Sequence, residues 1–364
     1  MTPSGGARSP VARIGALPTG YARALIVLLI IAAFAILPTA YGDYLPQQIT
    51  GYLVFGLLAL SVALVAGFAR LLNLGVGATF GVSAYAVAIA TQHHIFNPFL
   101  LFAAAIGCGL LVSGLFGVYS IVASGIQYMM LTFLTTLAFF SLPLALPKVM
   151  GGDNGLTVKG DLGVSFGLNP LLGNEFYWFV LAITALCAVL SWYVLDSQAG
   201  KAVRAMGRNP VRAAAMGYQV STYRVALTLF SGFIASIAGW LYVLQNAFVF
   251  QDLLGIQNSL NGLLYALIGG VDTIVGPLLG AGGLRFFIES VSRHSTQSSL
   301  YIGAALLLVV YFLPEGVLGL VRRGWRRLQA ARGGAVAAVT EEEADTAAAE
   351  AAFVGFEADD QRAL

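Results

Sequence analysis

The chain has 364 residues, of which 58% are hydrophobic and only 10% are charged, and its formal net charge is +2. Soluble domains carry about 25% charged residues, so this composition excludes an ordinary water-soluble protein and indicates that lipid solvates most of the chain. Each helical crossing of a bilayer needs about 20 apolar residues. The length therefore predicts an all-α, polytopic integral membrane protein with about 8–10 transmembrane helices, some of them broken by glycine.

Residues 1–20 are small, basic and rich in proline and glycine, which predicts a disordered tail. A first span is expected over 22–40 and a second over 49–69. The first apolar run follows several arginines and could be a signal peptide. It is longer than the usual apolar region of such peptides and more crossings follow, so we interpret it as a retained span.

Glycine interrupts the next apolar segment, residues 72–91. Gly75, Gly77 and Gly81 lie close together there, and each glycine costs about 1 kcal/mol relative to alanine inside a helix. The segment is therefore expected to be a broken or tightly packed helix. Further spans are predicted over 99–123, 128–146 and 176–195. Between them, residues 150–173 contain Asn-Gly and Gly-Gly pairs, which predict a compact external loop.

Residues 196–224 form a basic insert between two apolar runs, with five cations and the single acid Asp196. Positive residues in short loops stay in the cytoplasm. Within the insert we expect a short helix over 200–206 that ends at Gly207. A second is expected over 210–216, with Asn209 as N-cap, Pro210 at the first position and Gly217 past the end. Two turns are too short to be stable alone, so this helix must pack on its own subunit or on a partner.

A span is predicted over 225–246, after which residues 258–284 repeat the glycine-rich pattern. A last span over 300–321 ends in a cluster of arginines that belongs inside. Residues 258–292 must then cross the membrane an even number of times, either as a hairpin or as a re-entrant pair broken near 269–277. Asp272 is interpreted as a turn residue, and Arg285 and Glu289, spaced i,i+4, are expected to pair with each other.

Interrupted segments in both halves of a chain indicate a transport site, although close packing of small residues is the alternative for any single glycine. Several polar residues in or near the spans accompany the glycines. The candidate pathway residues are Asn73, Gly75, Gly77, Thr79, Tyr85, Gln127, Thr132, Asn258, Asn261, Gly269 and Gly270.

Several motifs are missing from the sequence. It contains no G-x-x-x-x-G-K-[ST] segment, so we expect no ATPase activity of its own. It also contains no catalytic or metal-ligating motif, so we expect neither an enzyme nor a metal site. Acids suited to a proton relay are scarce in the spans. An ion-coupled secondary transporter therefore remains an alternative with less support, and a membrane-embedded enzyme has little.

Six segments follow one another in a distinctive order: LNLGVGATFGVSAYAVA (72–88), YMMLTFLTTLAF (128–139), GGDNGLT (151–157), GKAVRAMGRNPVRAAAMGYQVSTYR (200–224), LIGGVDTIVGPLLGA (267–281) and FLPEGVLGL (312–320). In this order they resemble the permease family of branched-chain amino acid ABC importers, closer to the LivM type of subunit than to the LivH type. The resemblance covers about residues 45–325. Asp272 stands where the family more often has glycine.

The resemblance implies a permease subunit without a cofactor of its own, because a partner subunit hydrolyses ATP. It implies a second, LivH-type permease subunit, two cytoplasmic ATPase subunits and a periplasmic solute-binding protein, with no nucleic acid. Asp153 and Asn154 are candidates for contact with the binding protein. The residues expected to couple to the ATPase are Lys201, Arg204, Arg208, Asn209, Pro210, Arg212 and Gly217.

The expected organisation is a disordered tail over 1–20, a membrane domain over 21–325 with the loop 196–224, and a disordered acidic tail over 326–364. The protein would lie in the bacterial inner membrane with both termini in the cytoplasm. The implied substrates are branched-chain or related amino acids. Urea and short-chain amide permeases belong to the same superfamily, so such solutes are the alternative.

Overall fold

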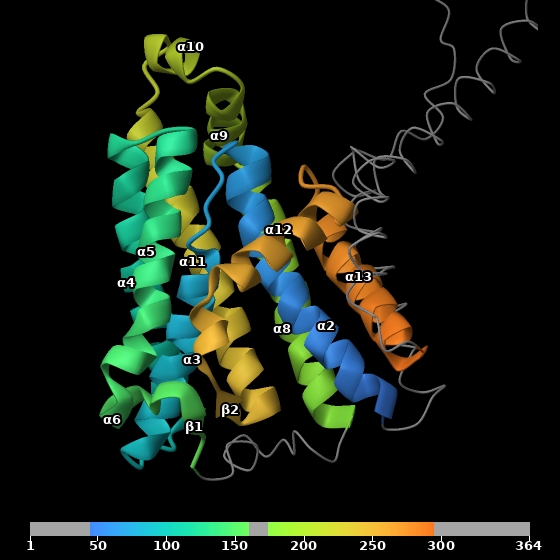
Figure 1. The fold of residues 1–364 in the computed structure, drawn as a ribbon. Helices are drawn as coiled ribbons and strands as arrows, with labels where there is room; N and C mark the ends of the chain where they lie inside the picture. Colours follow the sequence, from blue (N-terminus) through green and yellow to red (C-terminus); the bar gives the residue numbers. More distant parts are fainter. Residues whose placement is uncertain (1–43, 160–173, 295–364) are drawn as a thin grey trace, which may run out of the picture.

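A computed structural model describes residues 44–159 and 174–294 (Figure 1). The spans predicted over 22–40 and 300–321, both predicted tails and part of the predicted external loop lie outside these residues. The described part is mostly helical. Its main helices are α2 (Tyr44–Ala63), α3 (Val76–Gln92), α4 (Pro98–Val122), α5 (Ile126–Ala145), α8 (Asn174–Asp196), α9 (Gln198–Arg208), α10 (Pro210–Ala215), α11 (Val220–Asn246), α12 (Ile256–Gly269) and α13 (Val275–His294).

Five helices in the described ranges are long and apolar enough to cross a membrane, which confirms the all-α membrane class. They are Pro46–Phe68, Pro98–Val122, Ile126–Ala145, Glu175–Asp196 and Val220–Asn246. The first combines α2 with a π-helical turn, η1 (Leu64–Phe68). The last begins five residues before the predicted start at residue 225, so α11 takes in the end of the basic insert.

Short elements hold the loops at one end of the bundle. After α5 come α6 (Pro147–Met150) and the 3₁₀ turn η2 (Gly152–Asn154). Strand β1 (Leu156–Thr157) then pairs antiparallel with β2 (Phe248–Val249), with Leu156 opposite Val249. The ladder fastens the loop after α5 to the end of α11. We call this end of the bundle, with α6, β1 and β2, the loop end (Figure 1).

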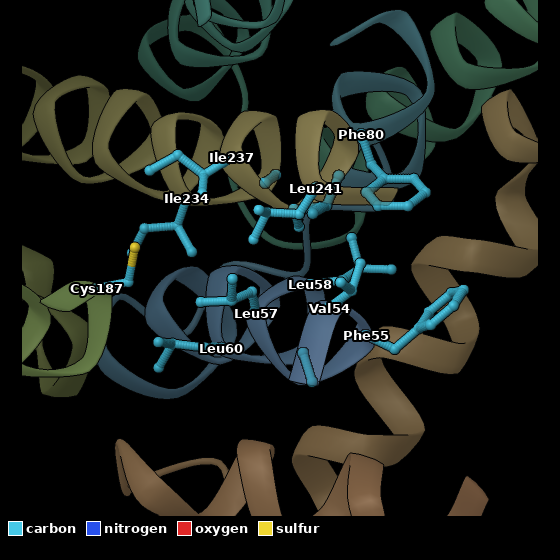
Figure 2. Packing of buried hydrophobic residues seen from close by; sticks show 14 of the residues in the cluster. Val54, Phe55, Leu57, Leu58, Leu60, Phe80, Cys187, Ile234, Ile237 and Leu241 are labelled. Atoms are coloured by element: carbon cyan, nitrogen blue, oxygen red, sulfur yellow. The ribbon is translucent and has the colours of Figure 1, made fainter. Parts of the chain in front are cut away.

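Helix α2 lies at the centre of the bundle. In its most apolar window 89% of the residues are buried, against 22% for α5, so α2 is a core helix and α5 is peripheral. Figure 2 shows α2 and α11 packed through their aliphatic side chains, with Phe80 of α3 and Cys187 of α8 at the edges of the contact. The labelled contact residues of α2 and α11 are Val54, Leu57, Leu58, Ile234, Ile237 and Leu241.

Helices α12 and α13 form a hairpin, and the chain enters α12 near the middle of the bundle. The 3₁₀ turn η3 (Gln251–Leu254) packs on Gly81, near the middle of α3. Helix α12 has 14 residues, about 21 Å at 1.5 Å per residue, which is too short to cross a hydrocarbon core of about 30 Å. The helical part of the first arm therefore covers only about two thirds of that thickness, and the chain turns back between Gly270 and Ile274. The structure thus combines the two predicted arrangements, a hairpin and a broken segment.

Candidate functional site

The basic insert folds into α9 and α10 at the end of the bundle opposite the loop end (Figure 1). We call this the basic end, defined by Lys201, Arg204, Arg208 and Arg212. The Ser197 hydroxyl accepts a hydrogen bond from the Gly200 amide (3.3 Å) and so caps α9. The Asn209 Oδ1 atom accepts one from the Arg212 amide (3.0 Å), which confirms the predicted cap of α10.

The predicted end of α9 is wrong by two residues. The helix runs through Gly207 to Arg208, and Asn209 ends it. Gly207 instead lies against the carbonyl oxygen of Phe68 in η1, where a Cβ atom would overlap that oxygen. The glycine therefore serves a close approach between two segments rather than the end of a helix. Gly217 does adopt a positive φ of 86°, as predicted for the residue past α10.

Helix α10 is almost entirely exposed. Only Ala213 is buried among its residues, while Val211 is 77% exposed and the following Met216 is 66% exposed. Arg208 and Arg212 are exposed beside them. Arg204 differs, because its guanidinium lies over the Phe68 ring at 5.2 Å from the ring centroid. A short, capped helix thus presents apolar and cationic side chains outside the apolar bundle.

Substituting Asn209 with alanine should destabilise α10, because the helix has six residues and depends on its cap. Loss of such a cap costs about 1 kcal/mol, which raises the unfolded population about fivefold. We expect tryptic cleavage after Arg208 and Arg212 to accelerate by about that factor in the purified protein. Asn209→Ser keeps the capping oxygen and should cleave at the original rate. Equal cleavage of both variants would show that the cap does not hold α10.

The break before α3 is a non-helical stretch inside the bundle. Its backbone is satisfied by side chains from two other helices. The Leu74 amide donates to Thr132 Oγ1 (3.2 Å), and the Leu74 carbonyl accepts from Thr136 Oγ1 (3.0 Å) and from Ser259 Oγ (2.6 Å). Ser259 Oγ also accepts from the Gly77 amide (2.7 Å). Buried partners of this kind are what non-helical backbone at membrane depth requires.

The candidate pathway residues occupy different environments. Buried positions are Asn73, Gly75, Gly77, Thr79, Tyr85, Thr132, Gly269 and Gly270. Gln127 is exposed at the start of α5, and Asn258 and Asn261 are half-buried. Of the whole candidate set only Asn258 lines the cavity described next. A pathway role for the others stays a prediction.

A cavity of about 740 Å³ opens between α2, α5, α11, α12 and α13. It lies toward the loop end, because the first turns of α2 and the last turn of α11 line it. Its wall combines aromatic rings, side-chain amides and three charged groups. The lining residues are Gln47, Gln48, Gly51, Tyr52, Phe55, Leu137, Phe140, Tyr242, Gln245, Asn246, Phe250, Asp252, Leu253, Gly255, Ile256, Gln257, Asn258, Arg285 and Glu289.

The predicted pairing of Arg285 with Glu289 is wrong. Glu289 Oε2 accepts hydrogen bonds from the Tyr52 hydroxyl (2.7 Å) and from Gln48 Nε2 (2.9 Å), both on α2. The Arg285 guanidinium lies 3.4 Å from the centroid of the Phe55 ring, and its Nε donates to the Tyr265 hydroxyl (3.4 Å). The facing helices therefore supply partners that replace the local pair. The feature of the sequence that could have indicated this site is the presence of two charged residues one turn apart in an apolar segment.

At the loop end, Asp153 and Asn154 lie exposed on η2. The loop that carries them is anchored by the β1–β2 ladder and by a hydrogen bond from Gln92 Nε2 to the Thr157 carbonyl (2.7 Å). Both side chains therefore sit on a braced surface at the opposite end of the bundle from α10 (Figure 1). Contact with a binding protein stays a prediction.

A helical membrane bundle with a broken hairpin, a cavity toward one end and an exposed basic helix at the other end is the architecture of a transport protein. Residues 47–320 match the family described as the branched-chain amino acid transport system, permease component. The chain belongs to this family. It is the membrane-embedded permease subunit of an ABC importer, a class that works with ATPase and solute-binding partners.

The relatives of this chain are named for the import of several different substrates. The chain is 26% identical to the ribose import permease RbsC of Haemophilus influenzae, over 71% of this chain and 79% of that one. It is 26% identical to the fructose import permease FrcC of Rhizobium meliloti, over 72% and 75%. It is 25% identical to the branched-chain amino acid permease LivM of Escherichia coli, over 74% and 69%. No solved structure matches.

Proposed function

We propose that this permease moves branched-chain or related amino acids into the cell and that α10 is its docking helix for the ATPase. The family match supports the substrate class. The exposed surface of α10 supports the docking helix, because Val211 and Met216 are exposed apolar side chains beside two arginines. A solvent-exposed apolar patch rimmed by charge marks an interaction site. In a subunit that works with an ATPase, the ATPase is the partner that this surface fits.

The distribution of charge gives the orientation that we propose. The cations of the basic end assign it to the cytoplasm by the positive-inside rule, and the loop end with Asp153 and Asn154 then faces outward, toward the binding protein. Both termini would lie in the cytoplasm. A homologous LivH-type subunit would complete the membrane domain.

The mechanism that we propose is alternating access driven by the ATPase. When ATP closes the ATPase dimer, α10 moves and carries α9 with it. Helix α9 touches η1 twice, because Gly207 packs on the Phe68 carbonyl and Arg204 lies over the Phe68 ring. On its other side, η1 touches the α12–α13 turn, where Gly67 packs on the Val271 carbonyl. These contacts form a continuous route from the docking helix to the broken hairpin.

Reversing the charge of Arg208 or Arg212 tests the docking helix. Each Glu substitution should lower ATP-dependent uptake into proteoliposomes about tenfold, the equivalent of 1.4 kcal/mol of lost interaction. Membrane insertion should be unchanged, because both side chains are exposed. Arg208→Lys and Arg212→Lys keep the positive charge at the same positions and should leave uptake close to its original rate. Normal uptake and normal co-purification of the ATPase in both arginine variants would refute the docking proposal.

Sugar import is the second candidate, because sugar permeases are among the relatives and the cavity wall carries side-chain amides and aromatic rings. Purification in mild detergent with identification of the bound subunits comes first. Recovery of an ATPase and a second permease then allows uptake of labelled leucine and ribose to be compared with the cognate binding protein present. Leucine uptake that depends on ATP supports the proposal. Ribose uptake without leucine uptake would replace it.

A further inference from the structure

We propose that Arg285 and Glu289 form a binding site for the charged head group of an α-amino acid, so that the permease itself selects a zwitterion. The proposal rests on the proposed amino-acid function and adds a site within the cavity to it. Arg285 would bind the carboxylate of the solute and Glu289 its ammonium group. Both side chains line the cavity, and both belong to α13.

The guanidinium of Arg285 is positioned to bind a carboxylate. Its central carbon lies 3.4 Å from the centroid of the Phe55 ring, a cation–π contact that restrains the position of the group. Among the described residues its only hydrogen bond is made through Nε, to the Tyr265 hydroxyl. The two terminal nitrogens are therefore available to the cavity, and they form the planar fork that binds carboxylates in a bidentate manner.

The carboxylate of Glu289 is held by donors that leave one oxygen available. Both of its hydrogen bonds within the described residues end on Oε2, from Tyr52 and from Gln48. The second oxygen, Oε1, can accept a hydrogen bond from an ammonium group. Because two donors on α2 already hold the carboxylate, little of its conformational freedom remains to be lost when a ligand binds.

The spacing of the two groups suits an amino acid. Side chains at i and i+4 lie on one face of a helix with Cβ atoms about 5–6 Å apart, so a head group with adjacent carboxylate and ammonium groups fits between them. Phe55, Leu137 and Phe140 provide apolar wall for an aliphatic side chain. A neutral sugar would leave both charged side chains desolvated without an ionic partner. A site built for charged groups therefore rejects a neutral sugar strongly.

The experiment measures equilibrium binding to the complete transporter complex in lipid nanodiscs, without the binding protein. The probes are labelled L-leucine, with unlabelled 4-methylpentanoate, which lacks the ammonium group, 3-methylbutylamine, which lacks the carboxylate, and ribose as competitors. We expect each of the three competitors to bind about tenfold or more weakly than leucine.

Each variant should abolish one preference. Glu289→Gln should abolish the preference for leucine over 4-methylpentanoate, and Arg285→Gln should abolish the preference over 3-methylbutylamine. Arg285→Lys keeps the positive charge but not the planar fork, and it should lose part of the preference for leucine over 3-methylbutylamine. Lys148→Gln and Glu175→Gln make the same charge changes at exposed positions outside the cavity and should bind as the original protein does. Complex yield and basal ATPase rate report whether a variant folds.

The outcomes separate the site from the function. ATP-driven leucine uptake, together with unchanged preferences in folded Arg285→Gln and Glu289→Gln variants, would overturn the site and leave the proposed function standing. Uptake of ribose but not leucine by the original protein would overturn the amino-acid function and the site together. If Glu289→Gln fails to assemble, the Arg285→Lys variant decides whether the site exists. An undiminished preference of this variant for leucine over 3-methylbutylamine would overturn the carboxylate site.

Discussion

Replacing Gly269 with alanine should prevent the chain from assembling into a transport-competent complex. A Cβ atom on Gly269, the last residue of α12, would overlap the carbonyl oxygen of Gly276 near the start of α13. The two backbones touch again where Gly280 lies against the Tyr265 carbonyl. Neither obstacle is a flexible side chain, so the helices would have to separate. Overpacking of this kind costs about 3 kcal/mol.

The measurement is the yield of monodisperse complex in detergent and its thermal unfolding temperature. Gly282→Ala and Gly283→Ala are matched controls on α13, because a Cβ atom at either position meets nothing within 4 Å. Both should be neutral or should stabilise α13 by up to about 1 kcal/mol, through the higher helix propensity of alanine. A Gly269→Ala protein with the yield and unfolding temperature of the controls would contradict the packing of the hairpin.

Local rules predicted what depends on local sequence. Asn209 caps α10 and Gly217 has a positive φ, as the order of these residues indicates. The spans predicted over 99–123 and 176–195 match α4 and α8 closely, because length and hydropathy decide where a membrane helix begins and ends. The non-helical stretch before α3 also follows from its glycine-rich sequence.

The predictions that failed involve partners distant in the sequence. Gly207 was expected to end a helix, but the Phe68 carbonyl lies against it. Arg285 and Glu289 were expected to pair, but Tyr52 and Gln48, 237 and 241 residues before Glu289, take its carboxylate. The cavity was missed for the same reason, since the helices that line it come together only in the fold. The β1–β2 ladder is two residues long, too short to leave a pattern in the sequence.

Replacing Gly67 with alanine should uncouple ATP hydrolysis from transport. A Cβ atom on Gly67 would overlap the carbonyl oxygen of Val271 in the α12–α13 turn. Unlike the contact at Gly269, this one involves a turn that can yield, because Asp272 beside it is exposed. We therefore expect the complex to assemble with the turn displaced from η1. Gly207→Ala should act on the same route from the side of α9, through the Phe68 carbonyl.

In proteoliposomes, both variants should keep their basal ATPase activity while uptake falls about tenfold or more, as a loss of 1.4 kcal/mol or more in coupling would produce. Gly107→Ala on α4 is the matched control, since a Cβ atom there meets nothing within 4 Å. If uptake per ATP were unchanged in both variants, the route through η1 would be excluded. If only Gly207→Ala loses coupling, the motion passes from α9 to η1 but does not continue through the contact of Gly67 with the hairpin turn, which would contradict the second half of the route. The pair of substitutions therefore locates the point at which the motion of the docking helix reaches the membrane bundle.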